Sequence, residues 1–287
     1  MCLPPTMPAR CLSGRGPAVW LLAIVMASAP LAHAESNLRD LSDGEEALII
    51  GASASVCLLG YFLPRSETAI ESASEFRLNP LDRIMRNAIH PGDEWRSNFL
   101  DNRFGSVLTP TMAAIGVAAI DADRREFSRD IPMFLSGWAA TAGLTRIGKS
   151  FVQRERPYRA AGAEFPPGLE PGDPDHRRSF FSGHSSTAFF AAAFFNKRFR
   201  RHMRSEWRRD EYETGRWLSP AISFGWAGIV ALSRLHADRH YFTDVAVGAA
   251  VGAALAELYY HFSYETGGDA TDNAGARRYV FKLSFAL

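Results

Sequence analysis

Residues 218–260 read LSPAISFGWAGIVALSRLHADRHYFTDVAVGAAVGAALAELYY, and this stretch indicates the fold class most clearly. Two apolar runs, Leu218–Leu232 and Val245–Tyr260, flank a short polar segment. Neither run alternates apolar with polar residues as a half-buried strand does, and both have the length of bundle helices. The stretch therefore predicts two helices joined by a polar connection.

The rest of the chain repeats this pattern of apolar runs between charged or proline-rich segments. Residues 157–178 hold five prolines and predict an irregular loop. Strand signals are nearly absent, and only residues 279–285 alternate weakly. The sequence predicts an all-α fold, a helical bundle. The further apolar runs are 47–63, 107–120, 131–144 and 185–195.

The composition excludes several classes of protein. The 287 residues are 47% hydrophobic, which is too apolar for a disordered chain. A formal net charge of +1 gives no overall field that would attract nucleic acid. The three cysteines form no CxxC pair and exclude a disulfide framework. We therefore expect no nucleic-acid partner, and no protein partner is predicted.

The first chemical motif is Lys149-Ser-Phe-Val-Gln-Arg-Glu-Arg156-Pro157. Seven positions are about two helical turns, so we expect Lys149 and Arg156 on one helix face, with Pro157 ending the helix. Two such cations suit a phosphate group, because arginine binds it with a bidentate fork. Taken singly, the motif is equally typical of a solvated helix end.

The second motif is Phe181-Ser182-Gly183-His184, directly before an apolar run. We expect Ser182 and Gly183 at a helix N-terminus, where free N–H groups and the helix dipole favour anions. A histidine beside a bound anion, here His184, can act as a general acid. Ser-Gly-His is also an ordinary capping sequence.

The third motif is Ser233-Arg234-Leu-His-Ala-Asp-Arg-His240-Tyr-Phe-Thr-Asp244. His240 and Asp244 are four positions apart, so we expect them one helical turn apart. A carboxylate on one ring nitrogen fixes the tautomer and leaves the other nitrogen bare for nucleophilic attack. Arg234 adds a third cation. The remaining polar residues of the motif are expected to be solvated or supporting: His236, Asp238 and Arg239.

In order and spacing, the three motifs resemble the signature of the type 2 phosphatidic acid phosphatase (PAP2) superfamily. That group includes bacterial class A acid phosphatases and vanadium haloperoxidases, and its pattern is Lys-x6-Arg-Pro, Pro-Ser-Gly-His and Ser-Arg-x5-His-x3-Asp. The resemblance covers residues 105–260. One residue departs from it, because Phe181 stands where the family has proline. That proline shapes the turn rather than the chemistry.

The resemblance implies a metal-independent phosphatase of phosphate monoesters or of lipid phosphates and diphosphates. His240 would attack phosphorus and form a phosphohistidine, with Asp244 orienting its ring. His184 would protonate the leaving group. No metal or other cofactor is implied, because fixed cations can neutralise the phosphoryl oxygens. Five residues would bind those oxygens: Lys149, Arg156, Ser182, Gly183 and Arg234.

A vanadium-dependent haloperoxidase is the alternative, because the same residues would hold vanadate with His240 as the vanadium ligand. Vanadate inhibition of ester hydrolysis would indicate a phosphatase, and peroxide-dependent bromination would indicate a haloperoxidase. No sequence feature positively indicates halide oxidation, and none selects the leaving group of the phosphate ester.

The N-terminus has the pattern of a secretory signal. Arg10 and Arg15 precede the apolar stretch Val19–Met26, and Ala32-His33-Ala34 offers a cleavage site. We therefore divide the chain into four segments. They are a signal peptide (1–34), an N-terminal helical extension (35–104), a PAP2-like domain (105–265), and a linker with a C-terminal tail (266–287).

The number of possible membrane crossings and the length of the apolar runs predict the location of the protein. In a membrane-spanning chain, the seven Lys and Arg residues of Lys197–Arg209 would face the cytoplasm and the motifs the periplasm. The apolar runs are shorter than the usual span of about 20 residues, and a signal followed by three spans would leave Lys149 on the wrong side. We expect a soluble or peripherally membrane-bound periplasmic protein. An integral inner-membrane protein with its active site facing the periplasm is the alternative.

Overall fold

The computed structural model describes residues 41–63, 79–90, 108–120, 124–162 and 169–264. All of them belong to one compact unit, Glu35–Asn273. Within these ranges there are helices and no strands, so the predicted all-α fold is confirmed. The predicted signal peptide and C-terminal tail lie outside the described residues. The elements are α2 (Asp43–Phe62), α3 (Pro80–Ile89), α4 (Thr109–Ile120), α5 (Arg124–Val152), α6 (Pro157–Ala160), the 3₁₀ turn η3 (Pro174–Arg177), α7 (Gly183–Glu206), α8 (Arg209–Gly215), α9 (Leu218–His236) and α10 (Phe242–Tyr264).

Local sequence fixes where these helices begin. Ser42 caps α2 through a capping box, in which its hydroxyl accepts from the Glu45 amide and the Glu45 carboxylate accepts from the Ser42 amide. Asn79 caps α3, and Pro80 occupies the first turn, where its missing N–H is no loss. The hydroxyl of Ser182 caps α7.

Five helices are longer than the apolar runs that predicted them: α2, α5, α7, α9 and α10. Helix α5 has 29 residues and α7 has 24, because charged residues extend each helix beyond its buried stretch. The argument that the apolar runs are too short to span a membrane was wrong for three of them, 47–63, 218–232 and 245–260. Among the described residues, Asp43–Phe62, Arg209–His236 and Phe242–Ser263 are long and apolar enough to cross one.

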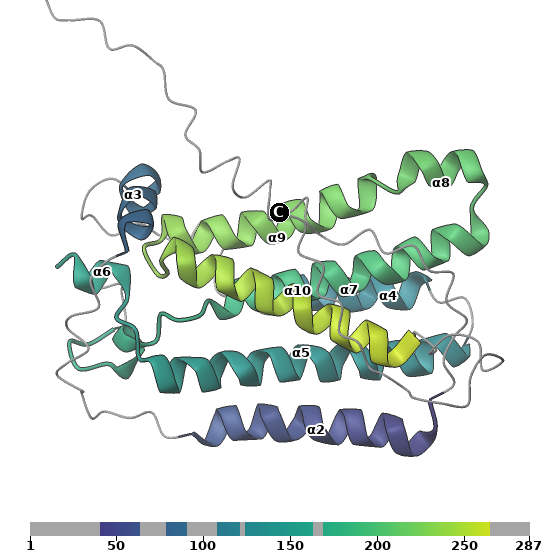
Figure 1. Ribbon diagram of the computed structural model, residues 1–287, viewed down its shortest axis with the longest axis horizontal. Helices are drawn as coiled ribbons and strands as arrows, with labels where there is room; N and C mark the ends of the chain where they lie inside the picture. The colour runs from purple at the N-terminus through teal and green to yellow at the C-terminus, as the bar shows by residue number, and fades with distance from the viewer. Residues whose placement is uncertain (1–40, 64–78, 91–107, 121–123, 163–168, 265–287) are drawn as a thin grey trace, which may run out of the picture. The chain divides into compact units, whose positions relative to one another are not determined.

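Helix α7 forms the centre of the bundle and packs against α4, α5, α9 and α10 (Figure 1). Phe190 and Phe194 of α7 are fully buried, and their ring centroids lie 5.7 and 5.5 Å from the ring centroid of Phe134 on α5. Burying each such ring contributes about 1.5–3 kcal/mol to stability.

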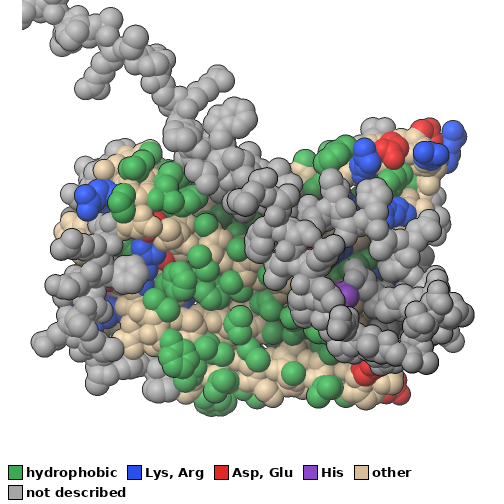
Figure 2. All heavy atoms as spheres, viewed as in Figure 1, with side chains coloured by type: hydrophobic (Ala, Val, Ile, Leu, Met, Phe, Trp, Pro, Cys, Tyr) green, Lys and Arg blue, Asp and Glu red, His purple; other side chains and the backbone are tan. Residues whose placement is uncertain are grey.

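Helix α2 packs along α5 with its remaining surface exposed. A Cβ atom at Gly60 would lie 2.4 Å from the carbonyl oxygen of Gly143, so only glycine permits this approach of the two backbones. Figure 2 shows hydrophobic side chains gathered over α2 and the helices next to it. The exposed large hydrophobic residues of α2 are Leu48, Ile50, Leu58, Leu59, Tyr61 and Phe62. An apolar surface of this kind is typical of a helix that contacts lipid or another protein.

The three sequence motifs lie at one end of the bundle. The C-terminal ends of α5 and α9 and the N-terminal ends of α7 and α10 meet there, beside α3 and α6 (Figure 1). The fold therefore brings together segments that lie far apart in the sequence.

Candidate active site

His240 lies in the connection between α9 and α10, two residues before α10 begins. Its side chain is buried, and its Nδ1 lies 2.7 Å from the carbonyl oxygen of Ser179. A carbonyl oxygen only accepts, so Nδ1 carries the proton and Nε2 is the bare nitrogen. The predicted bare ring nitrogen is therefore present, but a backbone carbonyl fixes the tautomer.

Asp244 lies in the first turn of α10 and faces the same nitrogen at a longer distance. Its Oδ2 is 3.7 Å from Nδ1 of His240, which is an ion-pair distance and too long for a hydrogen bond. Oδ2 instead accepts from the Ser179 hydroxyl at 2.5 Å and from the Tyr241 amide at 2.9 Å. The expected helical turn between His240 and Asp244 is absent because α10 begins only at Phe242. Asp244 is thus placed to stabilise positive charge on the ring without binding it directly.

Lys149 and Arg156 do not share a helix, so that prediction was wrong. Helix α5 ends at Val152, and Gln153 has a positive φ of 46° that turns the chain away. Pro157 begins α6 instead of ending a helix. The Arg156 guanidinium donates from Nη2 to Asp175 Oδ2 at 2.8 Å, from Nε to the Asp175 carbonyl at 2.8 Å, and from Nη1 to the Arg239 carbonyl at 2.9 Å.

The three predicted cations nevertheless lie close enough together to act on one another. Burial, followed by the positive charges of Arg156, Arg178 and Arg234, lowers the pKa of Lys149 to about 7, although Asp175 opposes the shift. Burial and the charges of Arg156, Lys149 and Arg234 hold the pKa of His240 well below its usual value. His240 is therefore neutral at physiological pH in a strongly positive environment, as an attacking nucleophile requires.

The second motif lies at the N-terminus of α7, as predicted. Ser182 is fully buried, and its hydroxyl accepts from the Ser185 amide at 3.4 Å and the Ser185 hydroxyl at 3.1 Å. Its amide donates to the carbonyl of Asp244 at 3.0 Å, which joins the start of α7 to the start of α10. Gly183 and His184 form the first turn, where helical N–H groups lack helical acceptors. Phe181 is buried against α5, where its ring lies 3.1 Å from the Cβ position of Gly148.

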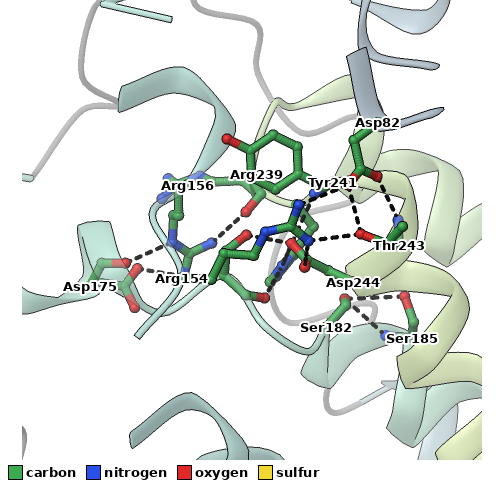
Figure 3. A network of polar contacts seen from close by, with 12 residues as sticks. Asp82, Arg154, Arg156, Asp175, Ser182, Ser185, Arg239, Tyr241, Thr243 and Asp244 are labelled. Carbon is green, nitrogen blue, oxygen red and sulfur yellow. Dashed lines mark hydrogen bonds and ion pairs between the residues drawn. The ribbon is translucent and has the colours of Figure 1, made fainter. Parts of the chain in front are cut away.

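Sequence reasoning missed two buried residues beside this site, Arg154 and Asp82 (Figure 3). Arg154 bridges two carboxylates, with Nη1 2.5 Å from Asp244 Oδ1 and Nη2 2.7 Å from Asp82 Oδ2. Arg154 lies inside the first motif, but the Lys-x6-Arg-Pro pattern does not specify the residue at its position. Asp82 is on α3, and no local pattern links it to the motifs.

The described residues contain no group of three His, Cys, Asp or Glu side chains that would hold a metal ion. The polar groups around His240 are mainly cations, which suit an anionic ligand. Metal independence stays a prediction.

The second half of the chain is similar to known proteins. Residues 133–267 match the PAP2 superfamily. Phospholipid phosphatase 1 of Rattus norvegicus is 29% identical over 144 residues, which is 44% of this chain and 49% of the relative. Lipid A 1-phosphatase of Porphyromonas gingivalis is 30% identical over 162 residues, 55% of this chain and 30% of the relative. The chain spans about half the length of the phospholipid phosphatases that it matches.

Two solved structures are similar in part. Aquifex aeolicus LpxE is 22% identical with a TM-score of 0.37, and the match covers 65% of this chain and 96% of that one. A transmembrane PAP2-type phosphatidylglycerolphosphate phosphatase from Bacillus subtilis is 18% identical with a TM-score of 0.40, covering 85% and 92%.

Proposed function

We propose that this chain, whose residues 133–267 belong to the PAP2 superfamily, is a phosphatase of lipid phosphates that works through a phosphohistidine. The observation that carries the proposal is the buried His240, whose Nδ1 donates to the Ser179 carbonyl while the positive charges of Lys149, Arg156 and Arg234 act on the ring. The similarity to phospholipid and lipid A phosphatases supports a lipid substrate over a small soluble ester.

The proposed reaction has two steps. Nε2 of His240 attacks phosphorus, the P–O bond to the alcohol breaks, and His184 gives its proton to the departing oxygen. His184 then takes a proton from water, whose oxygen attacks phosphorus and breaks the P–N bond. Phosphate leaves, and both histidines regain their starting states. The three cations neutralise the phosphoryl oxygens throughout, which is the main requirement of phosphoryl transfer.

A phosphate-release panel tests the proposal on full-length protein purified in detergent. The substrates are phosphatidic acid, a polyprenyl diphosphate, a lipid A phosphate and a soluble chromogenic phosphate ester. We expect release from at least one lipid substrate at a higher kcat/KM than from the soluble ester. Release from none of the four would refute the proposed function, and preference for the soluble ester would refute the lipid assignment.

Metal independence is a separate part of the proposal. Three cations take the place of the divalent ion that many phosphoryl-transfer enzymes use. We expect full activity after exhaustive EDTA treatment and gel filtration. Activity that disappears and returns only with Mg²⁺ or Zn²⁺ would contradict the three-cation mechanism.

We also propose that the protein is held in the membrane with its active site at the periplasmic face. The length and apolar character of α2, α9 and α10 support the integral alternative over the soluble form. The basic segment 197–209 includes the C-terminal part of α7, at the opposite end of that helix from Ser182, and the positive-inside rule favours the cytoplasm for such a segment.

A further inference from the structure

A buried chain of charges connects α3 to Asp244. Asp82 on α3 accepts from Arg154 Nη2 at 2.7 Å, and Arg154 Nη1 donates to Asp244 Oδ1 at 2.5 Å. All three side chains are at most 4% exposed. Such a network is stable only when every member is paired, so each residue constrains the next.

Thr243 closes this network into a ring. Its amide and hydroxyl donate to the two oxygens of Asp82 at 2.9 and 2.8 Å, and its hydroxyl accepts from Arg154 Nη1 at 2.7 Å. Thr243 directly precedes Asp244, so Asp82 holds the backbone at the start of α10 as well as the arginine. The Arg154 guanidinium also lies 4.0 Å from the ring centroid of Tyr241, which fixes its plane.

Both oxygens of the Asp244 carboxylate accept hydrogen bonds. Oδ1 accepts from Arg154, and Oδ2 accepts from Ser179 and the Tyr241 amide. This arrangement holds Asp244 at 3.7 Å from His240 and leaves the ring proton to the Ser179 carbonyl.

We propose that Arg154 and Asp82 are positioning residues for the reaction at His240, with Arg154 compensating the charge of Asp244 and Asp82 holding Arg154 in place. The inference rests on the proposed function. It assigns a role to α3, which lies outside the residues that match the family.

The sign of the effect follows from the charges that face His240. They are the cations Lys149, Arg156 and Arg234 and the anion Asp244. Without Arg154, the uncompensated Asp244 would attract a proton to the imidazole, and more of the histidine would be protonated and unable to attack. Without the charge of Asp82, Arg154 would compensate Asp244 more strongly, so protonation of His240 would not increase.

The test is the pH dependence of kcat/KM for release of phosphate from the best substrate of the panel. In Arg154→Gln, we expect the acidic limb of the profile to move upward by about one pH unit or more. Arg154→Lys keeps the charge, so its acidic limb should stay at the wild-type position even if kcat falls. In Asp82→Asn, kcat should fall while the limb stays at or below the wild-type position.

Arg86→Gln is the matched control, because Arg86 is also on α3 but pairs with Asp238 at 2.8 Å instead of reaching Asp244. Its acidic limb should not move. An upward shift in Arg86→Gln or Asp82→Asn would show that loosened packing of α3 explains the data, and an unchanged limb in Arg154→Gln would refute the inference. If Arg154→Gln does not fold, the pH profile of Arg154→Lys provides the test. An upward shift of its acidic limb would refute the inference. Failure of the proposed function is a different result, because the wild-type protein would then release no phosphate.

Discussion

A main-chain carbonyl fixes the tautomer of the His240 ring. The Ser179 carbonyl holds Nδ1, while the carboxylate of Asp244 stays at a distance from which it can stabilise an imidazolium. A carbonyl oxygen only accepts, so Nδ1 carries the proton of the neutral ring and Nε2 is its bare nitrogen. The carboxylate of Asp244 then acts electrostatically, which requires a fixed distance from the ring. Arg154, Ser179 and the Tyr241 amide hold it there.

His240→Ala should abolish turnover and leave the fold intact. Removing a nucleophile lowers kcat by several orders of magnitude in comparable enzymes. Phosphate release and thermal unfolding would be measured on the same purified sample. His261→Ala, an exposed histidine at the far end of α10, is the control and should retain wild-type activity. More than about a tenth of the wild-type rate in His240→Ala would exclude it as nucleophile.

The lowered pKa of Lys149 predicts that activity falls as the pH rises. Its pKa is about 7, so the cation that binds phosphate is present below that pH and is lost as the pH rises. We expect kcat/KM to fall above pH 7. The fall in kcat should come at a higher pH, because bound phosphate raises the pKa of a neighbouring lysine. Profiles of both parameters between about pH 5 and 9 would be recorded.

Lys149→Arg is the informative variant for this limb, since arginine keeps its charge throughout that range. Its alkaline limb should move upward or disappear, even if the rate is lower. If the limb stays where it is in the wild type, another group controls it.

At the scale of elements, the site depends on how closely α7 and α10 cross. A Cβ atom at Gly252 would lie 2.0 Å from the Ser186 carbonyl oxygen, and one at Gly248 would lie 2.6 Å from the Ser182 carbonyl oxygen. Both obstacles are backbone atoms, which cannot turn aside as a side chain can. The crossing therefore sets the distance between the start of α7, with Ser182, and the start of α10, with Asp244.

Gly252→Ala should destabilise the protein by separating these helices. Overpacking of this kind typically lowers the free energy of unfolding by about 1–3 kcal/mol. The control is Gly225→Ala on α9, where nothing lies within 4 Å of the Cβ position and the helix should gain up to about 1 kcal/mol. Thermal unfolding of both variants in the same detergent gives the comparison. Equal unfolding temperatures would mean that the crossing tolerates a methyl group.

At the scale of the whole molecule, hydrophobic surface is concentrated on helices that enclose a polar site at one end. Helix α2 is 20 residues long and only 11% of its apolar stretch is buried, so the described residues leave most of that surface uncovered. For a protein proposed to act on lipid phosphates, a bilayer is the simplest partner, because it also delivers the substrate.

Fractionation of cells expressing the full chain tests this placement. We expect the protein in carbonate-washed membranes, released only by detergent, since burying α2 in lipid removes its exposed side chains from water. A known periplasmic protein serves as the marker for osmotic shock. Release of this chain together with that marker would establish the soluble form instead.

The helical class and the residues of the candidate site could be predicted from the sequence alone. Apolar runs without strand alternation predicted the bundle, and the cap at Ser182 followed from residue preferences within a single turn. The motifs containing Lys149, Arg234 and His240 are recognisable because the residues of each motif lie close together in the chain. These features depend on neighbours in the chain, so they are visible without a fold.

Which groups touch could not be predicted from the sequence, because it depends on how the helices pack. The positive φ of Gln153 breaks the helix that a seven-residue spacing suggested, and the Ser179 carbonyl replaces Asp244 as the partner of the imidazole. Asp82 reaches Arg154 from 72 positions away in the sequence. The physical reason is that burial makes every polar group find a partner wherever one is within reach, and reach is set by helix packing rather than by sequence distance.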